Sequence, residues 1–242
     1  MPTSAAIFAT LVVAATTLTA TALATGPEGA ASATDFVLVL VLLSNLMLAG
    51  SSRLRACIQL VAAQGMLLGL LPILSVEFGL ARSLALGAVS FVLKGIVFPR
   101  LLQRALRAAD VRHEVDPLVG YVASVLSGML IVVVAFWMAG RFALESPPLA
   151  GLTLPVSLAT ILTGLFLLVG RRTALVQVVG YLVLENGIFI FGVGLPHGVP
   201  LVVEMGILLD VFVAVFVLGI AVFHISREFD HIDVDQLSQL KD

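Results

Sequence analysis

Residues 174–194 read Ala-Leu-Val-Gln-Val-Val-Gly-Tyr-Leu-Val-Leu-Glu-Asn-Gly-Ile-Phe-Ile-Phe-Gly-Val-Gly, and Glu185 is the one charged residue among them. About 20 mainly apolar residues are enough for a helix to cross the hydrocarbon core of a bilayer. Backbone surrounded by lipid must satisfy its own hydrogen bonds, which a helix does within one segment. The stretch therefore predicts a transmembrane helix that carries a carboxyl group near its middle.

The composition extends this prediction to the whole chain. Of its 242 residues, 60% are hydrophobic and only 12% are charged, whereas soluble domains are about half apolar and a quarter charged. This balance excludes a water-soluble protein. The sequence predicts an all-α integral membrane protein with eight spans, at residues 5–25, 35–50, 56–74, 83–102, 118–139, 152–169, 174–194 and 199–223.

Several function classes are excluded by the residues that the chain lacks. A net charge of −2 provides no basic field for phosphates, so nucleic acid is not an expected partner. The single cysteine, Cys57, rules out an intrachain disulfide and an iron–sulfur cluster held by this chain alone. The sequence also has none of the usual nucleotide-binding or hydrolase motifs. We expect a subunit without a catalytic centre or cofactor of its own, so any redox chemistry belongs to another subunit.

The first span resembles a secretory signal, because Ala22-Leu23-Ala24 looks like a cleavage site. No Lys or Arg precedes it and its apolar stretch exceeds a usual signal core, so we expect a retained helix. The chain then divides into four parts: an N-terminal span with an outside loop (1–34), a three-helix unit with a cytoplasmic loop (35–117), a fifth span with an outside loop (118–151) and a second three-helix unit with a cytoplasmic tail (152–242).

Basic residues predict the orientation in the membrane. With both termini in the cytoplasm, ten of the 13 Lys and Arg lie inside, Arg82 and Arg141 lie outside, and Lys94 lies within a span. Loops on the cytoplasmic side carry an excess of Lys and Arg. We therefore expect a multi-pass protein of the cell inner membrane with both termini in the cytoplasm.

A weak internal repeat relates the two three-helix units. The first contains Gln64-Gly65 and then a helix with Lys94, and the second contains Asn186-Gly187 and then a helix with Asp210. The predicted topology gives both units the same orientation. This is the pattern of a parallel repeat, which membrane transporters use.

Four ionisable residues fall within predicted spans: Lys94, Glu185, Glu204 and Asp210. An ionised group at bilayer depth costs roughly 2.5–3.5 kcal/mol on insertion scales, so such groups usually face a partner or water. We interpret them as candidate ion-translocation residues. The structural alternatives are a buried ion pair that fixes helix packing for Lys94, hydrogen bonding with Asn186 across a helix interface for Glu185, and a solvated helix end for Glu204.

Two family resemblances follow from particular motifs. Residues 164–175, with Arg171-Arg172, then Glu185-Asn186-Gly187 and the tail 231–238 resemble subunit K of the respiratory NADH–quinone oxidoreductase. The whole chain, with its extra helices and the run Val203–Asp210, looks more like component E of hydrogenase-4 and of related formate hydrogenlyase complexes.

The resemblance implies a membrane-arm subunit of a complex I-like, energy-converting assembly built on a group 4 nickel–iron hydrogenase or a relative. The expected partners are antiporter-like membrane subunits, a membrane protein similar to the H component of complex I, and hydrophilic hydrogenase-like subunits that hold iron–sulfur clusters and a nickel–iron centre. The buried charges would contribute to proton or sodium translocation. Subunit K carries a glutamate in each of its last two helices. When the two sequences are aligned at Arg171-Arg172, the first glutamate position falls on Leu182. When they are aligned at the tail, the second falls near Phe212.

Two other functions remain open from the sequence. One is a purely structural membrane anchor, in which the buried charges only specify which helices pair. The other is an independent secondary transporter with a substrate site between the two repeats.

Overall fold

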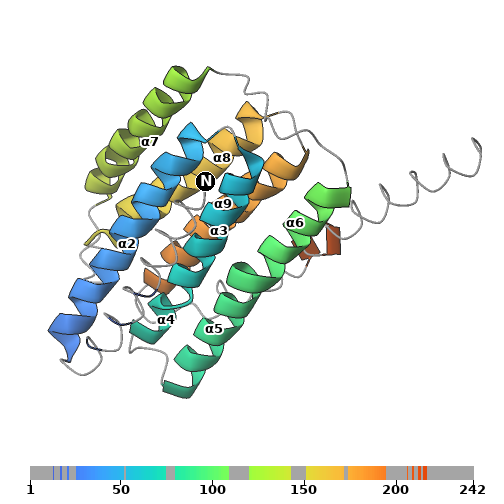
Figure 1. Ribbon diagram of the computed structural model, residues 1–242. Coiled ribbons are helices and arrows are strands. Elements are labelled where there is room, and N and C mark those ends of the chain that lie inside the picture. The colour runs from blue at the N-terminus through green and yellow to red at the C-terminus, as the bar shows by residue number, and fades with distance from the viewer. Residues whose placement is uncertain are drawn as a thin grey trace, which may run out of the picture.

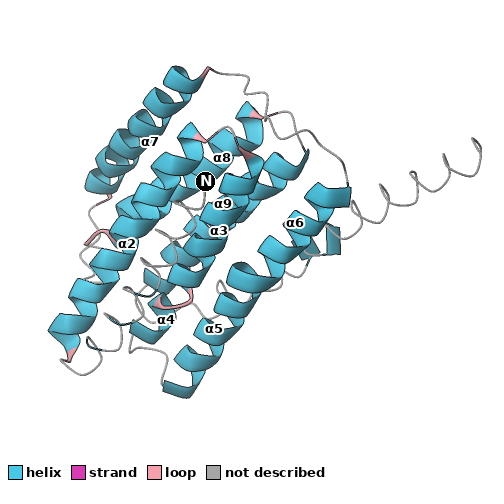
Figure 2. Cartoon of the chain, viewed as in Figure 1, coloured by secondary structure: helices cyan, strands magenta, loops and turns pink. Residues whose placement is uncertain are grey.

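The structure is a computed structural model that describes residues 26–51, 53–74, 80–108, 120–142, 151–171 and 174–194, and singly Val13, Thr17, Thr21, Gly206, Leu209, Phe212, Val213, Val215 and Phe216. Long helices lie side by side in one bundle (Figure 1). The part of the chain that is described contains helices and connecting turns and no strand (Figure 2).

The helices follow one another along the chain as α2 (Pro27–Gly50), α3 (Leu54–Leu68), α4 (Leu71–Leu74), α5 (Leu80–Val92), η2 (Leu93–Val97), α6 (Phe98–Ala108), α7 (Tyr121–Arg141), α8 (Thr153–Gly170) and α9 (Ala174–Gly194). The segment η2 is a π-helical turn that joins α5 and α6 without a break.

Within the described residues, six helical segments are long and apolar enough to cross a membrane. This confirms the all-α integral membrane class. The first and last of the eight predicted spans, 5–25 and 199–223, fall almost wholly outside the described residues, so the number eight stays a prediction. The division into four parts and the internal repeat stay predictions as well.

The start of the second span differs from the prediction. Residues 27–34 were expected to end an outside loop, but they form the first two turns of α2. Pro27 occupies the beginning of the helix, Glu28 lies in its first turn, and Gly26 precedes it with a φ of 87°. Proline and an acidic residue both favour a helix N-terminus. A boundary drawn from hydropathy alone therefore started the helix too late.

Helices α8 and α9 form the most closely packed pair of the bundle, because glycines let their backbones approach. A Cβ atom added to Gly187 would lie 2.6 Å from the backbone nitrogen of Ile161, and one added to Gly180 would lie 2.8 Å from that of Leu168. Small residues at such interfaces allow helices in membranes to pack closely. Helix α2 also packs against α8, and α3 packs against α9.

The remaining helices lie to either side of this centre. Helix α7 contacts α2 and α8 at one edge of the bundle, while the continuous helix α5–η2–α6 lies against α3 at the other edge (Figure 1). A polar contact ties two turns together, since Arg171 Nη2 donates a hydrogen bond of 3.1 Å to the Ser51 carbonyl. Burial lowers the pKa of the Arg171 guanidinium, which nevertheless keeps its charge at neutral pH.

Candidate functional site: a buried ion pair and its amide chain

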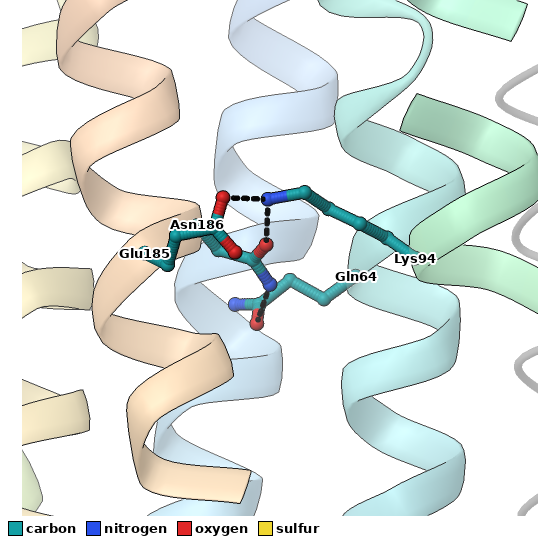
Figure 3. A network of polar contacts seen from close by, with 4 residues as sticks. All are labelled: Gln64, Lys94, Glu185 and Asn186. Atoms are coloured by element: carbon teal, nitrogen blue, oxygen red, sulfur yellow. Dashed lines mark hydrogen bonds and ion pairs between the residues drawn. The ribbon is translucent and has the colours of Figure 1, made fainter. Parts of the chain in front are cut away.

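A lysine and a glutamate meet in the interior of the bundle. Lys94 Nζ, from η2, lies 2.7 Å from Glu185 Oε1, from α9 (Figure 3). Lys94 is 4% exposed and Glu185 is 1% exposed. Both residues lie within helices that can cross the membrane. The two charges therefore compensate each other in a place where either one alone would be costly.

Asparagine and glutamine side chains extend this contact sideways. Lys94 Nζ also donates to Asn186 Oδ1 at 3.1 Å, and Asn186 Nδ2 donates to Gln64 Oε1 on α3 at 3.2 Å (Figure 3). Each amide presents its oxygen toward the lysine side and its nitrogen away from it. The ammonium group thus has two oxygen acceptors, a carboxylate and an amide.

The chain of amides continues into two further helices. Gln64 Nε2 donates to Asn45 Oδ1 on α2 at 2.8 Å and to Ser44 Oγ at 3.1 Å. Asn45 Nδ2 donates to Thr160 Oγ1 on α8 at 2.8 Å, and Thr160 donates to the Val156 carbonyl at 2.7 Å. All the donors from Lys94 to Thr160 point in one direction, so the network is directional and ends on a backbone acceptor.

Local sequence explains how the helices come close enough for these bonds. Gly65 follows Gln64, and a Cβ atom at Gly65 would collide with the Cβ of Lys94. Gly187 follows Asn186 and sits against Ile161 of α8. Two of the amides, Gln64 and Asn186, are therefore each followed by a glycine that admits a neighbouring helix. The π-helical turn at Leu93–Val97 sets the direction in which Lys94 leaves its helix, and such turns are common at functional sites.

The two charged groups of the pair differ in their surroundings. The Lys94 ammonium lies 5.2 Å from the centre of the Phe189 ring, a distance at which the ring face attracts a cation. Glu185 Oε2 is buried and has no hydrogen-bond partner among the described residues. Buried polar atoms are nearly always hydrogen-bonded, so a buried carboxylate oxygen without a partner needs an explanation. The ammonium group thus contacts the Glu185 and Asn186 oxygens and the Phe189 ring, whereas one oxygen of the carboxylate has no partner among the described residues.

Chemically, this arrangement contains groups that can bind and release a proton. Lys94 and Glu185 are the titratable members of the network, and the hydroxyl and amide groups around them do not titrate near neutral pH. No group of three or more His, Cys, Asp or Glu side chains that could hold a metal ion occurs in the described part of the chain.

Two of the four predicted site residues are brought together by the fold. Lys94 and Glu185, 91 positions apart in the chain, form one ion pair, which is also the structural alternative named for Lys94. Glu204 and Asp210 lie outside the described residues, so their part in the site stays a prediction. Asn186 bonds with Lys94 and Gln64, and the hydrogen bonding with Asn186 named as the alternative for Glu185 stays a prediction.

Sequence reasoning missed four members of the network. Gln64 was used only to mark the internal repeat, and Ser44, Asn45 and Thr160 were not considered. The available signal was an amide side chain within an apolar span, since Asn45, Gln64 and Asn186 all occupy such positions. Polar side chains there usually bond across helix interfaces.

Fold and site together define a multi-pass helical membrane protein with a charge-paired polar network inside its bundle. The chain belongs to the hydrogenase-4 component E family. It is 29% identical to hydrogenase-4 component E of Escherichia coli (strain K12) over 84% of this chain and 94% of that protein. It is also 34% identical to the uncharacterized protein Rv0085 of Mycobacterium tuberculosis, over 86% of this chain and 96% of that protein.

The other comparisons are negative. No protein-family model matches the chain, and no solved structure matches it. The resemblance of residues 152–242 to subunit K of NADH–quinone oxidoreductase is not confirmed and stays a prediction.

Proposed function

We propose that this chain is a membrane subunit of an energy-converting hydrogenase-like complex and that Lys94 and Glu185 form a station on its proton or sodium path. The observation that carries the proposal is the 2.7 Å ion pair buried within the membrane-spanning bundle. Ionisable residues inside membrane spans commonly mark ion pathways and proton relays. Family membership supports the assignment to a hydrogenase complex.

The pair can alternate between two protonation states. A proton that binds the Glu185 carboxylate removes its charge and leaves the Lys94 ammonium without its anion. An unpaired ammonium in a buried site is destabilised, so Lys94 then releases its proton more readily. When the Glu185 proton then passes to the neutral Lys94 amine, the carboxylate and the ammonium form again and the attraction between them is restored. One proton has then entered at the carboxylate and one has left from the amine.

Energy for this cycle would come from partner subunits. Redox reactions at iron–sulfur clusters and a nickel–iron centre in hydrophilic subunits would move charge or change hydration near the pair. Such a change would shift the populations of the two protonation states of the pair. Antiporter-like membrane subunits and a protein similar to the H component of complex I would adjoin this chain in the inner membrane, with both of its termini in the cytoplasm. Glu204 and Asp210 would continue the path.

Complex membership is tested by purification in mild detergent through a tag on this chain, followed by mass spectrometry. We expect a nickel–iron hydrogenase-like large subunit and antiporter-like subunits to copurify. A chain that purifies alone would contradict the assignment and favour an independent transporter.

The role of the pair is tested by neutral variants of similar size. Glu185→Gln and Lys94→Gln should abolish ion pumping per assembled complex in membrane vesicles. Glu28→Gln makes the same chemical change at an exposed site in the first turn of α2 and should leave pumping unchanged.

A structural anchor is the second candidate, because the directional amide chain links four helices and would serve helix pairing equally well. It predicts the opposite result in the same experiment. Glu185→Gln would lower the yield of complex, but the complexes that form would pump at the normal rate.

A further inference from the structure

Three polar side chains form a stripe along α9. Gln177, Tyr181 and Glu185 are spaced four residues apart, which places them on one face of a helix. Gln177 and Tyr181 line a cavity of about 360 Å³. The opposite wall of this cavity consists of Leu209, Phe212, Val213 and Phe216. The stripe therefore runs past a space between α9 and the C-terminal span and ends at the Glu185 carboxyl group.

Gly206 lies across from that carboxyl group. A Cβ atom at Gly206 would lie 3.5 Å from Glu185 Oε1, and no other described atom outside its own helix backbone lies within 4 Å of that Cβ position. At Gly65, Gly180 and Gly187, by contrast, a Cβ atom would collide with a neighbouring helix. Close packing against described residues therefore explains those three glycines. At Gly206, the described group that faces the position of a side chain is the Glu185 carboxylate.

The other side of the ion pair is closed. This side of the pair is filled by the hydrogen-bonded amides of Asn186, Gln64 and Asn45. Gln64 and Ser44 have no exposed surface. Amide groups in a fixed donor direction do not pass a proton on. The described amides on this side leave Glu185 Oε2 without a hydrogen bond, and the described residue of the C-terminal span that faces the carboxylate, next to Oε1, is Gly206.

We propose that water and the transported ion reach Glu185 through the space between α9 and the C-terminal span, along Gln177 and Tyr181 and past Gly206. The route begins at the N-terminal end of α9, which is predicted to face the cytoplasm. This proposal rests on the proposed function of Glu185 as a translocation site. It explains why Glu185 Oε2 is buried without a partner on the described part of the protein, since water along the route supplies a hydrogen-bond donor.

Most of the cavity lining is apolar, so a lipid chain is the competing occupant. The two cases differ in which thiol reagents can enter the cavity. A charged, water-soluble thiol reagent enters a hydrated space, whereas a space filled by lipid admits a lipophilic maleimide and excludes the charged reagent.

Cysteine labelling separates these cases without measuring transport. Cys57 is the only cysteine of the chain and is buried, so Cys57→Ala provides the background. In native membranes that contain the full chain, Gly206→Cys is treated with a cationic methanethiosulfonate or a pyrene maleimide. Ser44→Cys, on the closed side of the network, is the matched control. Leu209→Cys, in the cavity wall, replaces Gly206→Cys if that variant does not accumulate.

We expect the cationic reagent to label Gly206→Cys and Leu209→Cys and to leave Ser44→Cys unlabelled. Labelling by the maleimide alone would overturn the proposal in favour of a lipid-filled space. Equal labelling of Ser44→Cys, or no labelling of either route position by either reagent, would also overturn it. Because labelling does not depend on pumping, the route can hold while Glu185→Gln shows no transport defect, and the two proposals fail separately.

Discussion

At the scale of single residues, Lys94 and Glu185 depend on each other for their stability. Each replaces hydration with a partner at 2.7 Å, and the amide of Asn186 satisfies a further donor of the lysine. Removing one member of a buried pair leaves an uncompensated charge, whereas replacing both with apolar groups is often neutral. The energetic value of the pair is therefore visible only when single and double variants are compared.

Lys94→Met and Glu185→Leu should each destabilise the protein by about 3–5 kcal/mol, because each leaves a buried charge unpaired. The double variant should be more stable than either single variant. Thermal unfolding of the purified protein in lipid nanodiscs measures both effects. Additive losses in the double variant would show that the two side chains do not interact as the structure describes.

Gln64 has the largest number of partners in the amide chain. Gln64→Leu removes the acceptor of Asn186 Nδ2 and the donor to Asn45 Oδ1. A buried polar group without a partner costs about 1–3 kcal/mol, so this variant should unfold at a clearly lower temperature. The matched control is Gln103→Leu, since Gln103 is partly exposed on α6. If both variants unfold at the same temperature, Gln64 is not part of a cooperative network.

At the scale of helices, the α8–α9 pair positions the carboxylate. Glycines along both helices bring the two backbones together, and α9 carries Glu185 and Asn186 on the turn that faces η2 and α3. The position of α9 therefore decides whether the carboxylate reaches Lys94. The predicted repeat motif, an amide followed by a glycine, has its structural reason at this scale.

Gly187→Ala should disturb this pair, since the added Cβ would lie 2.6 Å from the Ile161 backbone nitrogen. Overpacking of this kind typically costs about 1–3 kcal/mol. Gly170→Ala is the control, because the nearest described group to its Cβ would be the Phe166 ring at 3.9 Å. Differential scanning calorimetry of the two variants should show a loss of stability for Gly187→Ala alone. Equal stability would mean that α8 and α9 are less closely packed than described.

At the scale of the whole molecule, the continuous helix from Leu80 to Ala108 reports the orientation in the membrane. Arg82 and Arg107 are exposed near its two ends. The excess of basic residues in the predicted cytoplasmic loops places Arg82 outside and Arg107 inside. The direction of the proposed ion route depends on this orientation.

Single cysteines at these two positions test the orientation. In the Cys57→Ala background, a membrane-impermeant maleimide added outside intact spheroplasts should label Arg82→Cys and should label Arg107→Cys only after permeabilisation. The reverse pattern would invert the topology and place the start of the proposed route on the outer side.

The sequence by itself determined the helical membrane class, most of the spans and the two buried charges that matter in the described site. Hydropathy is a sum over neighbouring residues, so a span such as Ala174–Gly194 can be recognised without knowing what surrounds it. The start of α2 could also have been predicted from Pro27, because the preference of proline for the first turn of a helix is a local property.

Only the tertiary structure decided which groups meet. The partner of Lys94 lies 91 positions away, and that of Asn45, Thr160, lies 115 positions away. The direction in which each side chain points depends on the rotation of its helix and on the helices packed against it, which no local pattern contains. Tertiary packing also separated the glycines whose Cβ position meets a neighbouring backbone from Gly206, whose Cβ position faces the Glu185 carboxylate. Spans thus followed from local solvation, whereas the ion pair, its amide chain and the buried position of Glu185 Oε2 followed from helix packing.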